Sequence, residues 1–314
     1  MEQNKMELTI EQIKSITENS FQIPSESSLM DITPVLIEKL GSINSDIREG
    51  CLEILYAWIM NGEYDNTTLI SLGDQLISLT HAGLGQEISD FVFLRAFTAL
   101  EVAGILVFDE KCEKGEIKGR NAFLTPEIVK RWFTTAVEYY HQERDYRSYV
   151  IGKGWAHSIA HGADLFRDFA KHRLIQKEEI LQIFQLFKQK LASPSLRAFK
   201  GKEELRIASA VYTALLRNKL DIHEINHWLS SIFDPFQEKD FWDFAKEPEK
   251  LNGYFHVERF FKDFYLMIKF GISRKGLFAH PYYNVSLQNR DEILKLLEQC
   301  ILNADNNSFY YKPD

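Results

Sequence analysis

The chain has 314 residues, of which 45% are hydrophobic and 26% charged, and its formal net charge is -8. This composition is typical of a folded globular protein with ample apolar material for a large core. The acidic balance argues against a general nucleic-acid-binding protein, because such a protein needs a surface of clustered Lys and Arg. Nucleic acid is therefore not an expected partner.

The segments that would direct the chain to a membrane or out of the cell are not evident. The start, MEQNKMELTIEQ, is charged and lacks the apolar stretch of a secretory signal. The most apolar stretch, Ala99–Phe108, is too short to span a bilayer and contains Glu101. Three widely separated cysteines, Cys51, Cys112 and Cys300, are typical of reduced thiols. The sequence predicts a cytoplasmic protein without a membrane span.

Apolar residues recur with helical periodicity along nearly the whole chain, and no convincing alternating strand pattern interrupts them. At least roughly 60% of the residues are therefore expected to be helical. The predicted helices cover about 8–18, 28–41, 45–61, 67–81, 88–108, 126–143, 153–172, 176–191, 202–218, 222–233, 252–271 and 288–303.

Several helix ends carry their own signals. Ser45 and Asp46 are expected to cap the helix that follows them, and Thr125 precedes a proline at a first helical position. Gly62 and the Ser193–Pro194 pair are expected to end helices.

Three of the predicted helices share a pattern of an apolar residue, an arginine and, three positions later, a small residue. The arginines are Arg48, Arg95 and Arg206. A helix pair every ~40–50 residues is typical of HEAT-like or armadillo-like solenoids. The sequence therefore predicts an all-α solenoid of stacked antiparallel helix pairs, as a single domain over 1–314. An irregular helical bundle is the alternative.

One predicted loop, Asp109–Phe123, is longer than helix packing requires. It mixes four basic with four acidic residues and holds two glycines, which indicates a solvated, mobile segment. Either plain disorder or a lid over a site would account for it.

The stretch GKGWAHSIAHGADLF contains the candidate functional residues. Gly152–Lys171 is predicted to form one amphipathic helix with His157, His161 and Asp164 on its polar face. The opposite, buried face is expected to hold Trp155 and Phe166.

Two interpretations of the polar face remain open. In one, it is a solvated surface whose residues pair along the helix. In the other, His157, His161 and Asp164 form a two-histidine, one-carboxylate metal site for Zn, Mn or Fe. That metal centre would support a hydrolase, with Asp145 as the candidate catalytic base.

Residues just before this stretch suggest a second kind of ligand. Arg147 and Lys153 could bind an anion beside a helix start, where the dipole is positive. A polar turn with internal ion pairs is the alternative. With Trp155 as a further candidate contact, the sequence favours a scaffold that binds a protein or small molecule in a concave polar groove. The metal-dependent hydrolase is the alternative function, and a helical nucleic-acid enzyme is the least favoured.

The run RDYRSYVIGKGWAHSIAHGADL, from Arg144 to Leu165, resembles the hallmark segment of a bacterial family of unknown function. The resemblance implies an all-helical, HEAT-like fold. Because that family has no established reaction, the resemblance implies no catalytic role for any residue.

Two other histidine sets are weaker candidates. His223 and His227 are four residues apart on what is expected to be a surface helix. His256, Arg259 and Asp263 share one stripe of a later helix, and that stripe could face the same groove as His157.

Overall fold

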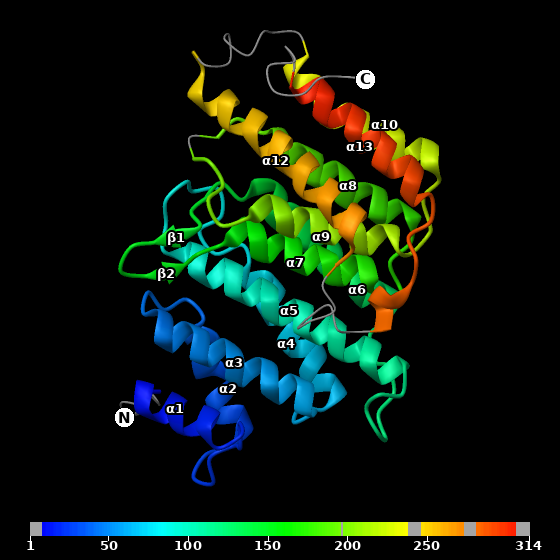
Figure 1. Ribbon diagram of the computed structural model, residues 1–314. Coiled ribbons are helices and arrows are strands. Elements are labelled where there is room, and N and C mark those ends of the chain that lie inside the picture. Colours follow the sequence, from blue (N-terminus) through cyan, green and yellow to red (C-terminus); the bar gives the residue numbers. More distant parts are fainter. Residues whose placement is uncertain (1–7, 196, 238–245, 273–280, 306–314) are drawn as a thin grey trace. The chain divides into compact units, whose positions relative to one another are not determined.

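The computed structural model describes residues 8–195, 197–237, 246–272 and 281–305 (Figure 1). Within these ranges the protein is all-α, with twelve α-helices, 68% helix and one hairpin of two-residue strands. Each predicted helix is found. The chain divides into two compact units, Met1–Leu165 and Phe166–Asp314. The single domain over 1–314 stays a prediction.

The first unit contains the earlier helices and the hairpin. Helix α5 packs against α2, α3 and α4, while α1 packs against α3 and α6 against α4. The elements are α1 (Ile10–Glu18), α2 (Leu29–Lys39), α3 (Ser45–Asn61), α4 (Asn66–Leu79), α5 (Phe91–Glu113), α6 (Pro126–Gln142), β1 (Tyr149–Val150), β2 (Gly154–Trp155) and α7 (Ser158–Lys171), the last of which extends beyond Leu165.

Helix α5 is the central helix of this unit because it is apolar nearly all round. By length and composition it could cross a membrane, and no other helix in the described ranges could. However, 78% of its most apolar window is buried inside the protein, as expected for a core helix. The structure thus gives no clear membrane span.

The helix ends follow the predicted signals with one correction. Helix α3 begins at Ser45 itself, and its cap is Asn44, whose side chain accepts hydrogen bonds from the amides of Asp46 and Ile47. Thr125 caps α6 as predicted. Gly62 ends α3 with a φ of 77°, a conformation that glycine adopts without strain.

The loop predicted from Asp109 starts later, because α5 continues to Glu113. Asp109 is buried, and its carboxylate accepts hydrogen bonds from the amides of Phe123 (2.6 Å) and Leu124 (2.9 Å). The Arg120 guanidinium binds three groups near the start of α4: the carbonyls of Gly62 and Tyr64 and the side chain of Asn66. The mobility of this loop stays a prediction, but these hydrogen bonds join the loop to neighbouring segments.

The second unit contains the later helices. Helix α12 packs against α8, α9 and α13, and α10 packs against α8 and α13. The elements are α8 (Lys177–Ala192), α9 (Glu203–Leu215), α10 (Ile222–Ile232), the 3-10 helix η1 (Asp234–Phe236), α12 (Pro248–Phe270), the 3-10 helix η3 (Pro281–Asn284) and α13 (Arg290–Ala304).

Two of the three repeat arginines play similar parts in the first unit. Arg48 and Arg95 are fully buried near the starts of α3 and α5. Each donates to a carbonyl of the loop before its own helix, Arg48 to Ser42 (2.6 Å) and Arg95 to Ala82 (2.8 Å). Arg206 lies in the first turn of α9 but is only partly buried. Their equivalence in a repeat stays a prediction.

Candidate binding site

The stretch before α7 is a hairpin, so the prediction of one helix from Gly152 to Lys171 is wrong at its start. Tyr149 pairs with Trp155 across the two antiparallel strands, and α7 begins only at Ser158. Gly152, Gly154 and His157 have φ values of 77°, 81° and 50°. These angles lie in the left-handed region and are incompatible with an α-helix.

A buried arginine holds the hairpin in place. The Arg48 guanidinium donates to the carbonyls of Lys153 (2.9 Å) and Trp155 (3.2 Å). It also stacks over the rings of Phe93 and Phe97, 4.2 and 4.8 Å from their centroids. Burial lowers the pKa of Arg48. An arginine nevertheless stays protonated in proteins, so the hairpin backbone rests on a buried cation.

Gly154 is required at the point where the hairpin meets α3. A Cβ atom added there would lie 2.9 Å from the Cβ of Ser45, and the φ of 81° disfavours any L side chain. The close approach places the Gly154 backbone directly beside the guanidinium of Arg48. Register and position of the hairpin are therefore fixed by packing.

Trp155 is 41% exposed, which overturns its predicted burial. Trp155 belongs to β2 and not to α7, so the helical periodicity from which its burial was predicted does not apply to it. Its ring centroid lies 4.2 Å from that of His157 and 5.1 Å from that of Tyr149. Tyr149 is 58% exposed and Ile151, at the hairpin turn, 93% exposed. The hairpin thus presents three large apolar side chains to solvent.

The predicted cluster of His157, His161 and Asp164 is brought together, and it is largely buried, which does not fit the interpretation of a solvated surface. The two imidazole centroids are 5.6 Å apart, and the His161 Nδ1 atom lies 3.6 Å from the Asp164 carboxylate. The His161 ring also packs in a T-shaped arrangement against the buried Phe97 ring, with centroids 5.5 Å apart. The Asp164 side chain is buried and that of His161 nearly so. Phe166 is buried, as predicted.

The predicted metal centre has no geometric support in the described residues. Within them, no group of three or more His, Cys, Asp and Glu side chains could hold a metal ion. Zn, Mn or Fe as a cofactor therefore stays a prediction from residue spacing alone.

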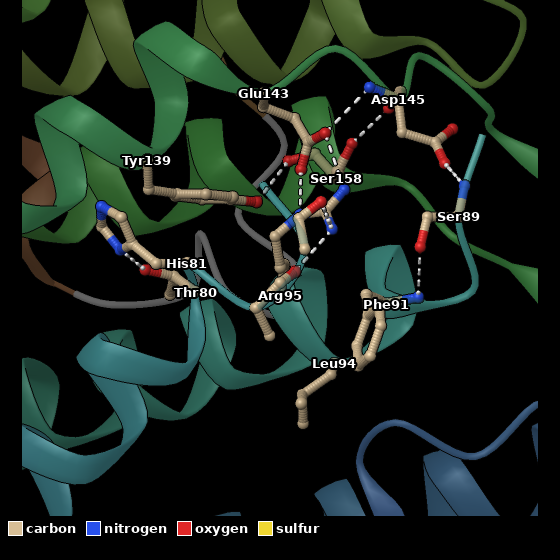
Figure 2. Close-up of polar contacts among 12 residues, drawn as sticks. Thr80, His81, Ser89, Phe91, Leu94, Arg95, Tyr139, Glu143, Asp145 and Ser158 are labelled. Carbon is tan, nitrogen blue, oxygen red and sulfur yellow. Dashed lines mark hydrogen bonds and ion pairs between the residues drawn. The ribbon is translucent and has the colours of Figure 1, made fainter. Parts of the chain in front are cut away.

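Asp145, the candidate catalytic base, is fully buried and engaged by donors. Its carboxylate accepts from Arg147 Nη2 (2.6 Å) and Nε (2.8 Å), and from the Ser89 amide (3.2 Å). Figure 2 shows the Asp145 side chain directed at Ser89. The hydrogen bonds to Asp145 raise the pKa of Arg147. These donors occupy the Asp145 carboxylate within the protein.

Glu143, which sequence reasoning missed, forms the other half of this network (Figure 2). Its carboxylate accepts two hydrogen bonds from Arg95, at 2.7 and 2.9 Å, and a third from the Asp145 amide at 2.8 Å. Both partners of the Arg95–Glu143 ion pair are fully buried. The run of alternating charges around 143–147 was its sequence signal. The pair joins the start of α5 to the segment that follows α6, and its role is structural.

The predicted anion-binding pair is neutralised within the protein. Arg147 pairs with Asp145 and donates to the Ser89 carbonyl at 2.8 Å. Lys153 forms an ion pair with Asp90 at 2.6 Å. These contacts fit the alternative interpretation, a polar turn with internal ion pairs. They also tie the hairpin to the start of α5.

Three further exposed apolar side chains lie on the segments that hold the hairpin. Ile43 precedes α3, Ile88 lies in the loop before α5, and Phe91 is the first residue of α5. The contacts of Arg48 and Lys153 place both segments against the hairpin. We call the resulting set the hairpin surface; it consists of Ile43, Ile88, Phe91, Tyr149, Ile151 and Trp155.

The remaining candidate sets lie elsewhere. His223 and His227 are exposed on α10, as predicted for a surface helix. His256 is fully buried in the second unit, where its Nε2 atom accepts a hydrogen bond from the Phe199 amide. It belongs to the core of that unit and not to its surface.

Comparison with known proteins places the chain by family alone. Residues 81–266, more than half of the chain, match the model of a family described as "Protein of unknown function (DUF2785)". The chain belongs to this family. No curated protein and no solved structure matches it. The region that DUF2785 covers includes the whole hairpin and the start of α5, so most of the hairpin surface lies within the family's own domain.

Proposed function

We propose that this DUF2785 protein is an interaction scaffold that binds a partner at the hairpin surface. The observation that carries the proposal is Trp155, which is exposed although its backbone is held by a fully buried arginine. Its ring rests against His157 and Tyr149. A large aromatic side chain that is both exposed and rigid is typical of a binding hot spot.

The energetics of folding give no reason for this arrangement. Ile151, which is 93% exposed, contributes almost none of the hydrophobic free energy that burial would supply, and Trp155, which is 41% exposed, contributes only part of it. The positive φ of His157 costs of the order of 1–3 kcal/mol, and such strain concentrates at functional sites. Burial of the Arg48 cation also opposes folding, although its hydrogen bonds to carbonyls offset part of that penalty.

The predicted polar groove around His157, His161 and Asp164 enters the proposal as the support beneath Trp155. The His157 ring lies against the tryptophan ring at an angle of 32°, and His161 contacts both the His157 ring and the Asp164 carboxylate. In this view the two histidines orient the exposed ring, and His157, which is partly exposed, lines the edge of the surface.

The proposal includes a HEAT-like solenoid as the frame of the scaffold and a cytoplasmic location. Contacts of α3 with α1 and α5, and of α4 with α6, support stacking of alternate helices in the first unit. Three buried free cysteines, Cys51, Cys112 and Cys300, fit a reducing compartment.

The metal-dependent hydrolase is the weaker candidate. Asp145 is engaged by Arg147 and backbone amides, and Asp164 lies against His161. With no three-residue metal cluster in the described ranges, the geometry supports binding more strongly than hydrolysis.

A photo-crosslinking experiment in cells that make the protein tests the proposal. A photoreactive phenylalanine analogue replaces Ile151 in one variant and Leu266, an exposed apolar residue of α12, in the control. We expect a discrete adduct from position 151, and its loss when Trp155→Ala is added. Equal adducts from both positions, or an adduct that Trp155→Ala leaves unchanged, would contradict the proposal.

A further inference from the structure

The hairpin surface is apolar at its centre and acidic around it. The segments that form it, 42–49, 86–91 and 149–155, contain four exposed acidic residues: Asp46, Glu49, Glu87 and Asp90. Their basic residues are Arg48, which is fully buried, bound to carbonyls and 4.0 Å from the Glu49 carboxylate, and Lys153, which pairs with Asp90. Exposed carboxylates therefore outnumber exposed cations on this surface.

We infer that the partner is a polypeptide segment that presents an apolar side chain flanked by lysine or arginine. The apolar side chain would pack against Trp155 and Ile151, and the flanking cations would face Glu49 and Glu87. The inference rests on the proposed function and adds the chemical class of the partner. It follows from complementarity, since opposite charges around an apolar contact favour and steer association.

The same charges argue against the other partners that an apolar hairpin could serve. An exposed isoleucine beside tryptophan and tyrosine is also typical of a loop that enters a membrane interface. Such loops gain affinity for anionic lipid headgroups from neighbouring lysines and arginines. Here the segments carry four exposed carboxylates against two cations, both of which are paired within the protein, and this excess of negative charge would repel both an anionic bilayer and the phosphates of nucleic acid.

Two features of the acidic rim make the inference specific. Glu49 is half-exposed and follows the buried Arg48 directly in the sequence; its carboxylate lies 4.0 Å from the Arg48 guanidinium that holds the hairpin, and so at the margin of the hairpin. Glu87 is exposed in the loop that leads into α5, beside the exposed Ile88. Because both carboxylates are solvated, each contact would be weak and screened by salt. Affinity would therefore depend mainly on the aromatic contact and selectivity on the charges.

Selection from a phage-displayed library of random twelve-residue peptides on the full chain tests the inference. We expect recovered peptides to combine an aromatic or large aliphatic residue with a net positive charge. One synthetic peptide is then titrated by fluorescence anisotropy. Trp155→Ala should weaken it at least tenfold, and Glu49→Gln with Glu87→Gln by about three- to tenfold. Raising the salt should reproduce the second effect.

The matched control is the pair Glu249→Gln and Glu292→Gln, exposed glutamates of the second unit that should leave the affinity unchanged. Peptides that need Trp155 but carry no positive charge would overturn the inference and leave the proposed function standing. Peptides that bind independently of Trp155, or no selected peptide at all, would overturn both. Binding to vesicles of phosphatidylcholine and phosphatidylglycerol that Ile151→Ser abolishes would replace the polypeptide with a membrane.

Discussion

Two pairs of a histidine and an aromatic ring, one in each compact unit, use the same contact for different ends. In the second unit Phe199 and His256 stack with centroids 3.8 Å apart and planes at 9°, and both are buried. In the first unit Trp155 and His157 lie 4.2 Å apart at 32°, with Trp155 exposed. The buried pair contributes to stability, whereas in the other pair Trp155 presents part of its ring to solvent.

The hydrogen bonds of the histidines sharpen the contrast. His256 Nε2 accepts from the Phe199 amide, so in the neutral ring the proton sits on Nδ1. Burial, with a smaller contribution from the positive charge of Arg259, lowers the pKa of His256 to about 3. This ring is therefore neutral at physiological pH and serves as a fixed acceptor within the core.

The largest effect is expected from His256→Ala. It removes a buried ring and leaves the Phe199 amide without its acceptor, which together destabilise the protein by about 3–4 kcal/mol. Urea denaturation followed by circular dichroism at pH 7.5 measures the change. His227→Ala, on the exposed face of α10, is the control and should change stability by less than ~0.5 kcal/mol. If both variants lost the same free energy of unfolding, the buried Phe199–His256 pair would contribute no more to stability than an exposed histidine.

Titration of His256 gives the next largest effect. Its pKa is about 3 in the folded protein and about 6.5 in the unfolded chain, so the unfolded state binds more protons between these values. Stability from this group is therefore complete above pH 6.5 and falls by about 1.4 kcal/mol per unit as the pH decreases towards 3. Denaturation curves from pH 7 to 4.5 should show a shallower decline for His256→Asn than for the wild type. Parallel declines would disprove the assignment.

A buried carboxyl in the first unit should respond to pH in the opposite direction. Glu101 of α5 is fully buried, neither of its carboxyl oxygens has a hydrogen-bond partner among the residues that the structure describes, and burial raises its pKa well above the ordinary value. The folded state thus holds a proton that the unfolded chain releases above about pH 4.5, and stability decreases as the pH rises. We expect Glu101→Gln to be more stable than the wild type at pH 8 by about 1–2 kcal/mol.

Thermal unfolding of both proteins at pH 5 and pH 8 checks this prediction. The advantage of Glu101→Gln should shrink at pH 5, which is close to the ordinary value of 4.5, because release of the proton by the unfolded chain favours unfolding much less there than at pH 8. Glu110→Gln, a change at a more accessible carboxylate of the same helix, serves as the comparison. An advantage of the same size at both pH values would mean that Glu101 is not protonated in the folded protein.

The sequence predicts the helices well because helical periodicity reports which face of each helix is apolar. It fails at Gly152–His157, where the backbone enters the left-handed region three times and periodicity has no meaning. The two glycines were a signal for a turn, but nothing in the sequence marks the positive φ of His157. Any prediction that treats this stretch as a helix therefore places Trp155 on the wrong face.

The candidate site shows a second limit. Spacing correctly predicted that His157 and His161 lie close together, since local geometry depends on neighbouring residues. What covers Asp164 depends on tertiary packing, and no local pattern reports that it is buried. Likewise, the amino-acid type of Ile43 and Ile88 does not show that these residues are exposed, because isoleucine is also common in the core. The hydrogen bond from Arg48 to the Lys153 carbonyl joins residues more than a hundred positions apart, so no local pattern could have predicted it.

The smallest effect on stability is also the most informative about function. Trp155→Ala removes an exposed ring, so the free energy of unfolding should change by less than ~0.5 kcal/mol. Phe199→Ala, the matching change in the buried pair, should destabilise by about 3 kcal/mol because it opens a cavity. Denaturation of the two variants side by side measures both. If Trp155→Ala is as damaging as Phe199→Ala, then Trp155 is structural and the hairpin surface is part of the core. If stability is kept while crosslinking from position 151 is lost, the exposed pair serves binding and the buried pair serves the fold.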